Sequence, residues 1–186
     1  MNLEEYKKWL EKKRNLEERE AFRVVEEILN YHQSNFKTYK IVQLFPRVKF
    51  KGMEFDLLIF LSDKVKPVEK RDYWDRLIGV EFKETDTKTV IKQAILRTEY
   101  VDYQYIATKN VYLDYPEIFL MTLFGIGWVV WGDNFAKLIV PGRWKPHYEK
   151  INELVNYLIN VRMEDLIKSV VNKSLKEFFR RENRGG

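Results

Sequence analysis

The sequence predicts an α/β fold in which helices flank a mixed central sheet and a C-terminal helical extension follows. The run DLLIFL, which begins at Asp56, is apolar on both faces, as is typical of a strand buried inside a sheet. Apolar residues at helical spacing on both sides of the strand region indicate covering helices. The 186 residues, 45% of them hydrophobic, suffice to bury a core. We expect an α/β core over residues 1–145 and the helical extension over 146–186, packing on the core or mediating a dimer.

The chain begins with a segment predicted to be one helix, residues 2–31, because Phe22, Val25 and Ile28 recur at helical spacing. Glu18 lies on the same stripe. It is therefore expected to point inward near one end of the sheet, although an ordinary first-turn acid favoured by the helix dipole explains it equally well.

The strands of the predicted sheet come next. Residues 39–50 and 53–61 are predicted strands joined by a turn at Lys51-Gly52. A polar segment, 62–76, is long for a connection, so it either contacts a ligand or forms a solvated loop. The remaining predicted elements are a strand over 77–83, helices over 87–100, 116–124 and 147–181, and strands over 102–107, 128–131 and 136–140.

Composition excludes several classes of function. The chain has no cysteine and two histidines, so disulfides and zinc–thiolate sites are excluded, and a histidine-based zinc site or a Ser-His-Asp triad is disfavoured. Hard-cation chemistry through oxygen ligands remains. No apolar run reaches the roughly 18 residues of a membrane span, and the N-terminal segment is too charged for a signal peptide. We therefore expect a cytoplasmic protein that does not enter a membrane.

Positive charge is both global and local. The net charge is +5 and the pI is about 9.2, which permits a polyanionic partner. The segment 37–51 contains five basic residues and no acid: Lys37, Lys40, Arg47, Lys49 and Lys51.

Two carboxylates and a lysine form the strongest functional pattern. On the strand 77–83, Glu81 and Lys83 project from the same face, opposite Val80 and Phe82. If Asp56 lies on the adjacent strand, two carboxylates converge beside a lysine, which is what divalent-metal hydrolysis of a phosphodiester needs. The alternative is a solvated Glu81–Lys83 ion pair. A carboxylate at the start of a buried strand is costly, however, unless a metal ion or a lysine compensates its charge.

The helix after this strand carries an aligned polar row. Gln93, Arg97 and Tyr100 stand at i, i+4 and i+7, and they could face either a phosphate group or solvent.

These motifs and their order resemble the PD-(D/E)XK nuclease superfamily over roughly residues 14–108. Glu18-Arg19 resembles the Glu-Arg of the first helix in archaeal Holliday-junction resolvases, and EFDLLI (54–59) looks like the family's second motif. The segment VEFKE supplies the Glu81 and Lys83 of the E-x-K motif. Gln93-Ala94 resembles the Gln-Ala of the helix that follows this strand. The combination looks most like small archaeal or crenarchaeal-virus nucleases.

The sequence also departs from the family's pattern. Phe55 replaces the proline for which the family is named, and Arg97 stands where RecB-type members carry a tyrosine. The resolvases' serine upstream of Asp56 is missing, which puts junction specificity in doubt.

The resemblance implies a restriction-endonuclease-like fold and a Mg²⁺- or Mn²⁺-dependent DNA endonuclease that leaves 5′-phosphate ends. Structure-selective cleavage and junction resolution are both open as its activity. Asp56, Glu81 and the Phe82 carbonyl would bind the metal, and Glu18 would assist through a water or a second ion. Lys83 would orient or deprotonate the attacking water, and Gln93 would position Lys83 or the phosphate.

The implied partners are DNA and a second copy of the chain, in a homodimer located in the host cytoplasm if the protein is viral. Contacts to the DNA backbone are expected from Lys37, Lys40, Arg47, Lys49, Lys51 and Arg97.

Two other interpretations remain open. One is a non-catalytic nucleic-acid-binding or assembly protein that retains the nuclease fold. The other is a helix-rich scaffold protein with coincidental motifs, in which the carboxylates of Asp56 and Glu81 would lie more than about 8 Å apart, too far to share a metal ion.

Overall fold

A computed structural model describes residues 1–12, 16–36, 38–64 and 71–162; for residues 16–19 only the backbone is described. The elements are, in chain order, α1 (Leu3–Glu11), α2 (Leu16–Asn35), β1 (Ile41–Phe50), β2 (Met53–Ser62), β3 (Arg76–Lys83), α3 (Thr87–Arg97), a 3₁₀ turn (Thr98–Tyr100), β4 (Tyr103–Thr108), α4 (Tyr115–Phe124), β5 (Gly127–Gly132) and β6 (Phe135–Val140). Residues 148–162 form a further helix.

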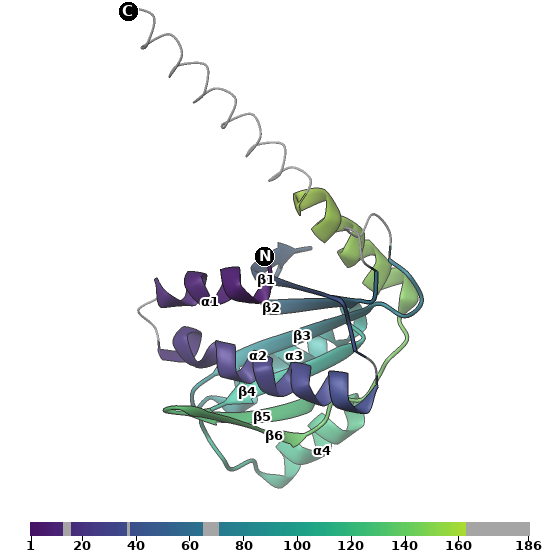
Figure 1. Cartoon of the computed structure of the whole chain (residues 1–186). Helices are drawn as coiled ribbons and strands as arrows, with labels where there is room; N and C mark the ends of the chain where they lie inside the picture. Colours follow the sequence, from purple (N-terminus) through teal and green to yellow (C-terminus); the bar gives the residue numbers. More distant parts are fainter. Residues whose placement is uncertain (13–15, 37, 65–70, 163–186) are drawn as a thin grey trace, which may run out of the picture.

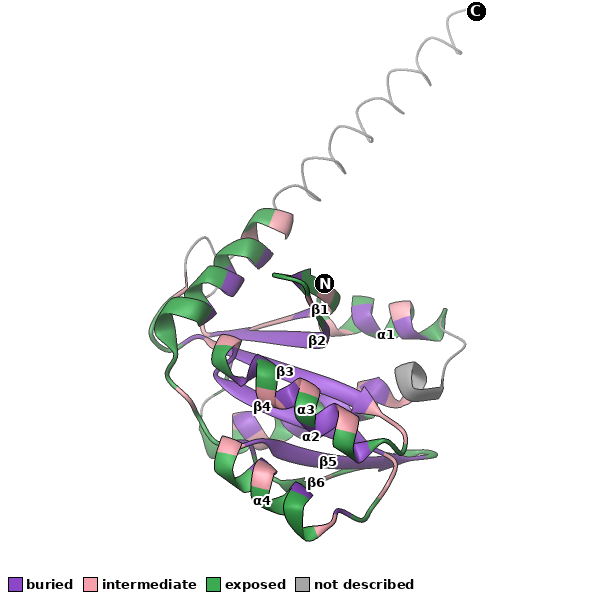
Figure 2. Ribbon diagram, turned by 180° about the vertical axis from the view of Figure 1, so that it is seen from behind, coloured by how far each residue is buried: buried purple, intermediate pink, exposed green. Residues whose placement is uncertain are grey.

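The strands form one six-stranded sheet in the order β1-β2-β3-β4-β5-β6. The pairs β3–β4 and β4–β5 are parallel, and the other neighbours are antiparallel. Helices α1 and α2 lie on one face, whereas α3, α4 and helix 148–162 lie on the other (Figures 1 and 2). The predicted mixed sheet flanked by helices is confirmed.

Strand β2 explains why both faces are covered. Leu57, Ile59 and Leu61 pack into the cluster under α1 and α2. Leu58 and Phe60 point the other way, into a cluster that includes the buried stripe of helix 148–162: Ile151, Leu154, Val155 and Leu158. Successive strand residues face opposite sides, so a continuous apolar run requires cover on both.

The N-terminal region differs from its prediction, because the single helix expected over 2–31 is two helices. Helix α1 has its own beginning, a capping box between Asn2 and Glu5, and it ends with Lys12 as its C-cap. It buries Tyr6 and Leu10 against the sheet.

The C-terminal helix was expected either to cover the sheet or to mediate a dimer. Its first apolar stripe covers the sheet. The second stripe, beyond residue 162, and the tail RRENRGG lie outside the described residues. Within the described residues, no helix has both the length and the apolar character needed to cross a bilayer.

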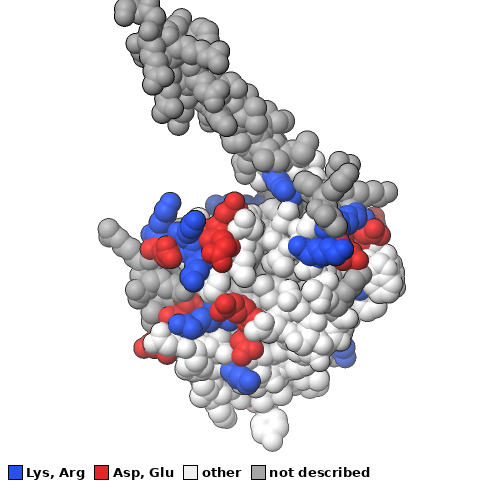
Figure 3. Space-filling model, viewed as in Figure 1, with Lys and Arg blue, Asp and Glu red and all other residues white. Residues whose placement is uncertain are grey.

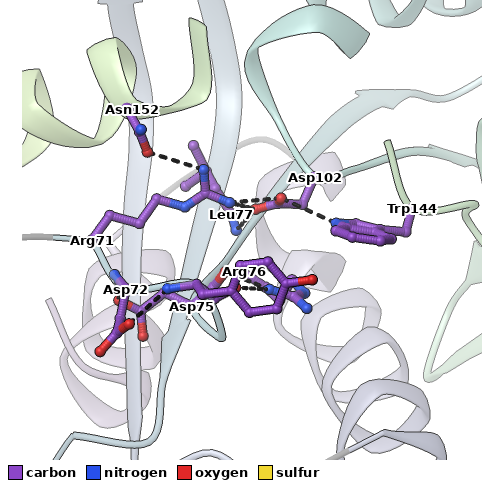
Figure 4. Close-up of polar contacts among 9 residues, drawn as sticks. Arg71, Asp72, Asp75, Arg76, Leu77, Asp102, Trp144 and Asn152 are labelled. Carbon is purple, nitrogen blue, oxygen red and sulfur yellow. Dashed lines mark hydrogen bonds and ion pairs between the residues drawn. The ribbon is translucent and has the colours of Figure 1, made fainter. Parts of the chain in front are cut away.

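A buried polar cluster around Asp102 ties three segments together (Figure 4). Arg71 donates to both carboxylate oxygens of Asp102, at 2.7 and 2.8 Å. The Leu77 N–H donates to the same carboxylate at 2.7 Å, and Trp144 Nε1 does so at 3.3 Å. Arg71 also donates to Asn152 of helix 148–162. The end of the polar segment 62–76 is thus structural, while residues 65–70 lie outside the described chain.

Candidate functional site

Asp56 and Glu81 are neighbours across β2 and β3. Leu57 pairs with Val80, so the residue before Leu57 lies beside the residue after Val80. The Phe82 N–H donates to Asp56 Oδ2 at 2.9 Å, so this N–H faces β2. Asp56 and Glu81 therefore occupy a non-hydrogen-bonded position, where facing side chains approach most closely. This adjacency contradicts the scaffold interpretation, which required the two carboxylates to lie apart.

The two carboxyl groups are shielded from water to different extents, Asp56 partly and Glu81 completely. Glu81 is fully buried, and burial raises its pKa well above the usual range, with the charge of Asp56 adding to the effect. Burial also raises the pKa of Asp56, but the Phe82 N–H, Arg97 and Lys83 act in the opposite direction. Glu81 is therefore the carboxyl group that holds a proton more tightly. The solvated Glu81–Lys83 ion pair does not fit, because Glu81 is not exposed.

Arg97 is the unexpected member of the site. Its Nε lies 3.2 Å from Glu81 Oε1, within ion-pair distance but without the geometry of a hydrogen bond. Its Nη2 donates to the Glu54 carbonyl, and only 9% of its side chain is exposed. The predicted polar row therefore does not place Arg97 toward solvent or an external phosphate, because two buried carboxylates attract its charge inward.

The carboxylate oxygens of Glu81 accept no N–H or O–H hydrogen bond within the described chain, and the group that Glu81 can bond is the neighbouring Asp56 carboxyl, by sharing a proton with it. Buried carboxylate oxygens normally accept such bonds, and an exception calls for an explanation such as an ion. In a β-strand the N–H and C=O of one residue point to the same side, so the Phe82 carbonyl is expected to face β2, as its N–H does. Two carboxylates and one carbonyl suit Mg²⁺, which binds few protein ligands and keeps several waters.

Beyond Asp56, Glu81 and the Phe82 carbonyl, the structure describes no further side chain of the predicted metal site. The described residues contain no group of three or more His, Cys, Asp or Glu side chains that could hold a metal ion. The side chain of Glu18, the expected additional carboxylate, lies outside the description, although its backbone belongs to α2.

Lys83 and Gln93 lie at the border of the buried pair. Lys83 is half-buried, and its charge lowers the pKa of Asp56. Gln93 is half-buried and sits one helical turn before Arg97, so it is on the same face of α3. The structure thus brings Asp56, Glu81 and Arg97 together, with Lys83 close enough for its charge to act on Asp56, while Gln93 lies one helical turn before Arg97 on α3.

A groove of about 1130 Å³ runs along the β1 edge, between α1 and helix 148–162. Its lining includes four basic residues (Lys40, Arg47, Lys49 and Arg162), one acidic residue (Glu5) and the aromatic residues Trp9, Phe45 and Tyr157.

The groove borders the strand that carries Asp56, although neither Asp56 nor Glu81 is part of its lining. The pairs Pro46–Leu57 and Val48–Phe55 flank Arg47 and Asp56, so these two residues face each other in the register. Of the other predicted DNA contacts, Lys49 lies 3.7 Å from Glu54, Lys51 pairs with Glu153 at 2.7 Å, and Lys37 lies outside the described residues.

The sequence does not reveal that the Arg97 side chain points inward toward Glu81, or that Arg71 and Asp102 form a buried ion pair. A signal for Asp102 was present, because it directly precedes a buried strand, as Asp56 begins an apolar run. No local pattern identifies the arginine partners, which come from other elements.

Comparison with known proteins assigns no family to this chain. No family model matches the sequence, and no curated protein matches it significantly. Among solved structures, SPO1766, a protein of unknown function from Silicibacter pomeroyi, is similar with a TM-score of 0.48. The two are 10% identical, and the match covers 82% of this chain and 91% of that one.

Proposed function

We propose that this protein is a metal-dependent nuclease that hydrolyses DNA phosphodiester bonds at a site of the PD-(D/E)XK type. One observation carries the proposal: fully buried Glu81, whose carboxylate oxygens accept no N–H hydrogen bond from the described residues, lies beside half-buried Asp56, and Lys83 follows two residues later on β3. The order of elements, a helix, a β-hairpin, the E-x-K strand, a helix and a parallel strand, is that of the resemblance. The restriction-endonuclease-like fold is part of this proposal.

The carboxylates of Asp56 and Glu81 and the Phe82 carbonyl would hold Mg²⁺. The bound ion would lower the pKa of a water and neutralise charge on the transition state. Lys83, whose charge already acts on Asp56, would orient the attacking water or take its proton. Gln93 would hold Lys83 or the scissile phosphate. Arg97 would keep the buried carboxylates compatible with the fold when no metal is present.

The groove along β1 supports DNA as the substrate. Lys40, Arg47 and Lys49 would contact backbone phosphates, and the aromatic side chains of the groove offer surfaces for unstacked bases. Arg47 lies opposite Asp56 in the β1–β2 register, so a DNA strand bound in this groove would lie along the strand next to the one that carries Asp56.

Cleavage assays with matched variants test the proposal. Supercoiled, linear, single-stranded and four-way-junction DNA are incubated with Mg²⁺ or Mn²⁺, and cleavage leaving 5′-phosphate ends is expected. Asp56→Asn and Lys83→Ala should each lose at least about 100-fold in rate, the usual scale of acid–base and electrostatic catalysis. Lys92→Ala, on the exposed side of α3, is the matched control and should retain activity. Absence of metal-dependent cleavage of every substrate, or full activity of Asp56→Asn, would refute the proposal.

A second candidate is a non-catalytic nucleic-acid-binding or assembly protein. The contact between Arg97 and Glu81 favours it, because a guanidinium already provides positive charge where a metal ion would do so. Calorimetric titration with Mn²⁺ separates the two functions. The nuclease should bind Mn²⁺ with a heat that Asp56→Ala removes. A binding protein should show no such heat, or one that Asp56→Ala leaves unchanged.

A further inference from the structure

Helix α4 presents an apolar face to solvent. Its outward residues follow helical spacing and are largely exposed: Tyr115 (90%), Ile118 (49%), Phe119 (66%) and Leu123 (56%). Val111 and Tyr112, in the segment before the helix, are 70% and 71% exposed. We call these six residues the α4 face. Large aromatic and aliphatic side chains clustered in this way are unusual on a solvated surface.

The opposite side of α4 is already satisfied. Met121 is buried and Leu120 and Phe124 are partly buried, in a cluster with α3, β4 and β5. Asp114 and Glu117 form a capping box, and Glu117 also accepts a hydrogen bond from Thr87 of α3. Arg143 donates to the Leu123 carbonyl at the other end. The helix is therefore held at both ends, and its outward residues take no part in the core of the described protein.

The area of the α4 face matches the apolar centre of a protein interface. With about 200 Å² for each aromatic and about 100 Å² for each aliphatic side chain, the exposed fractions amount to roughly 600 Å². Stable complexes bury about 800 Å² on each partner, including a polar rim. The largest apolar patch on a typical monomer is about 300–600 Å², and it is often functional, so the α4 face lies at the upper end of this range.

The charges around this face indicate what covers it. The exposed side of α4 carries no charged residue, since its two acids form the cap and its other exposed residues are Pro116 and Thr122. Figure 3, which views the molecule from the α1 and α2 side, shows that charged side chains gather over these two helices on the opposite face of the sheet from α4. Helix α4 itself has no Lys or Arg, the groups that attract nucleic acid or anionic lipid. Two basic residues from outside the helix contact its C-terminal end: Arg143 donates to the Thr122 and Leu123 carbonyls, and Lys145 lies over the Phe124 ring.

We propose that the α4 face is a self-association surface that packs against the same face of a second copy. In a two-fold interface each patch meets itself, so an uncharged patch avoids like-charge repulsion. The inference does not require the nuclease site.

Sedimentation equilibrium of the full chain over about 1–100 μM tests the surface, because standard-size interfaces commonly give dissociation constants in or below this range. The wild type should be dimeric. Phe119→Glu should raise the dissociation constant at least about 30-fold, as expected for charging a central hot spot. Leu96→Glu is the matched control: Leu96 is 67% exposed on α3, between the exposed Lys92 and Glu99, and its substitution should leave the dimer intact. Circular dichroism confirms that each variant folds, and the double variant Tyr115→Ser/Leu123→Ser repeats the test without adding charge.

A wild type that stays monomeric over this range would overturn the proposal, as would a dimer that survives both α4 variants. Flotation with phosphatidylcholine/phosphatidylserine vesicles gives a further outcome. A monomer that binds these vesicles through Phe119 would assign the face to a lipid surface instead. None of these measurements involves DNA cleavage, so the self-association proposal and the nuclease proposal can each fail without affecting the test of the other.

Discussion

At the residue scale, two buried acid–arginine pairs differ in how completely their polar atoms are satisfied. Asp102 accepts hydrogen bonds from Arg71, Leu77 and Trp144, which accounts for its role in holding segments together. Glu81 has one ion-pair contact, with Arg97, and accepts no N–H hydrogen bond from the described residues; its other polar neighbour is the Asp56 carboxyl, with which it can share a proton. Desolvation without hydrogen bonds is costly, and such sites are common where a ligand or ion binds. This difference separates a structural ion pair from the candidate metal site.

His32 provides a pH prediction at the same scale. Its ring is fully buried, contacts the Tyr105 hydroxyl at 3.0 Å, and burial lowers its pKa to about 4. Because the folded state resists protonation, the stability from neutral His32 is complete above about pH 6.5 and is lost as the pH falls toward 4. We expect this histidine to contribute about 3 kcal/mol to the decrease in the free energy of unfolding over that interval.

Urea unfolding at several pH values between 4 and 7 measures this effect. His32→Gln should show a shallower decrease than the wild type, whereas His147→Gln, which replaces an exposed histidine, should retain the wild-type slope. Equal slopes in the wild type and His32→Gln would show that the buried ring does not control acid stability.

At the scale of elements, the contact between β4 and β5 depends on a residue without a side chain. A Cβ atom at Gly127 would lie 2.4 Å from ring carbons of Tyr105 and 2.6 Å from the backbone nitrogen of Gly142. We expect Gly127→Ala to destabilise the protein by about 3 kcal/mol, the upper range for overpacking, because a backbone atom cannot move aside cheaply.

Gly52 is the comparison for this variant. It has a φ of 76° in the β1–β2 turn and no atom within 4 Å of an added Cβ, so Gly52→Ala should cost only the conformational penalty of about 1 kcal/mol. Chemical denaturation of both variants gives the ranking. A larger cost at Gly52 than at Gly127 would contradict this account of strand packing.

At the scale of the whole molecule, helix 148–162 belongs to the same core as the sheet. Leu154 is fully buried in the cluster that includes Leu58 and Leu77. We expect Leu154→Ala to cost about 2–5 kcal/mol, the range for a buried leucine. Leu96→Ala, at an exposed leucine, should cost less than about 0.5 kcal/mol, as is usual for surface substitutions.

Unfolding followed by circular dichroism and by tryptophan fluorescence checks whether the transition is shared. If the helix and the sheet form one unit, both signals change at the same denaturant concentration in the wild type and in Leu154→Ala. A separate, earlier transition of helical signal would show that residues 148–162 unfold independently of the sheet.

Local sequence patterns are enough to predict the positions of the strands and the acid-x-lysine motif on β3. Period-two patterns and the turn at Lys51-Gly52 are local, so strand positions and the inward or outward direction of Glu81 follow from neighbouring residues. Which residues contact Glu81 depends instead on the tertiary structure. Its contact with Arg97 and its position beside Asp56 depend on strand register and on the docking of α3, which join residues distant in the chain. The apolar face of α4 likewise became apparent only once packing showed which of its sides the core uses.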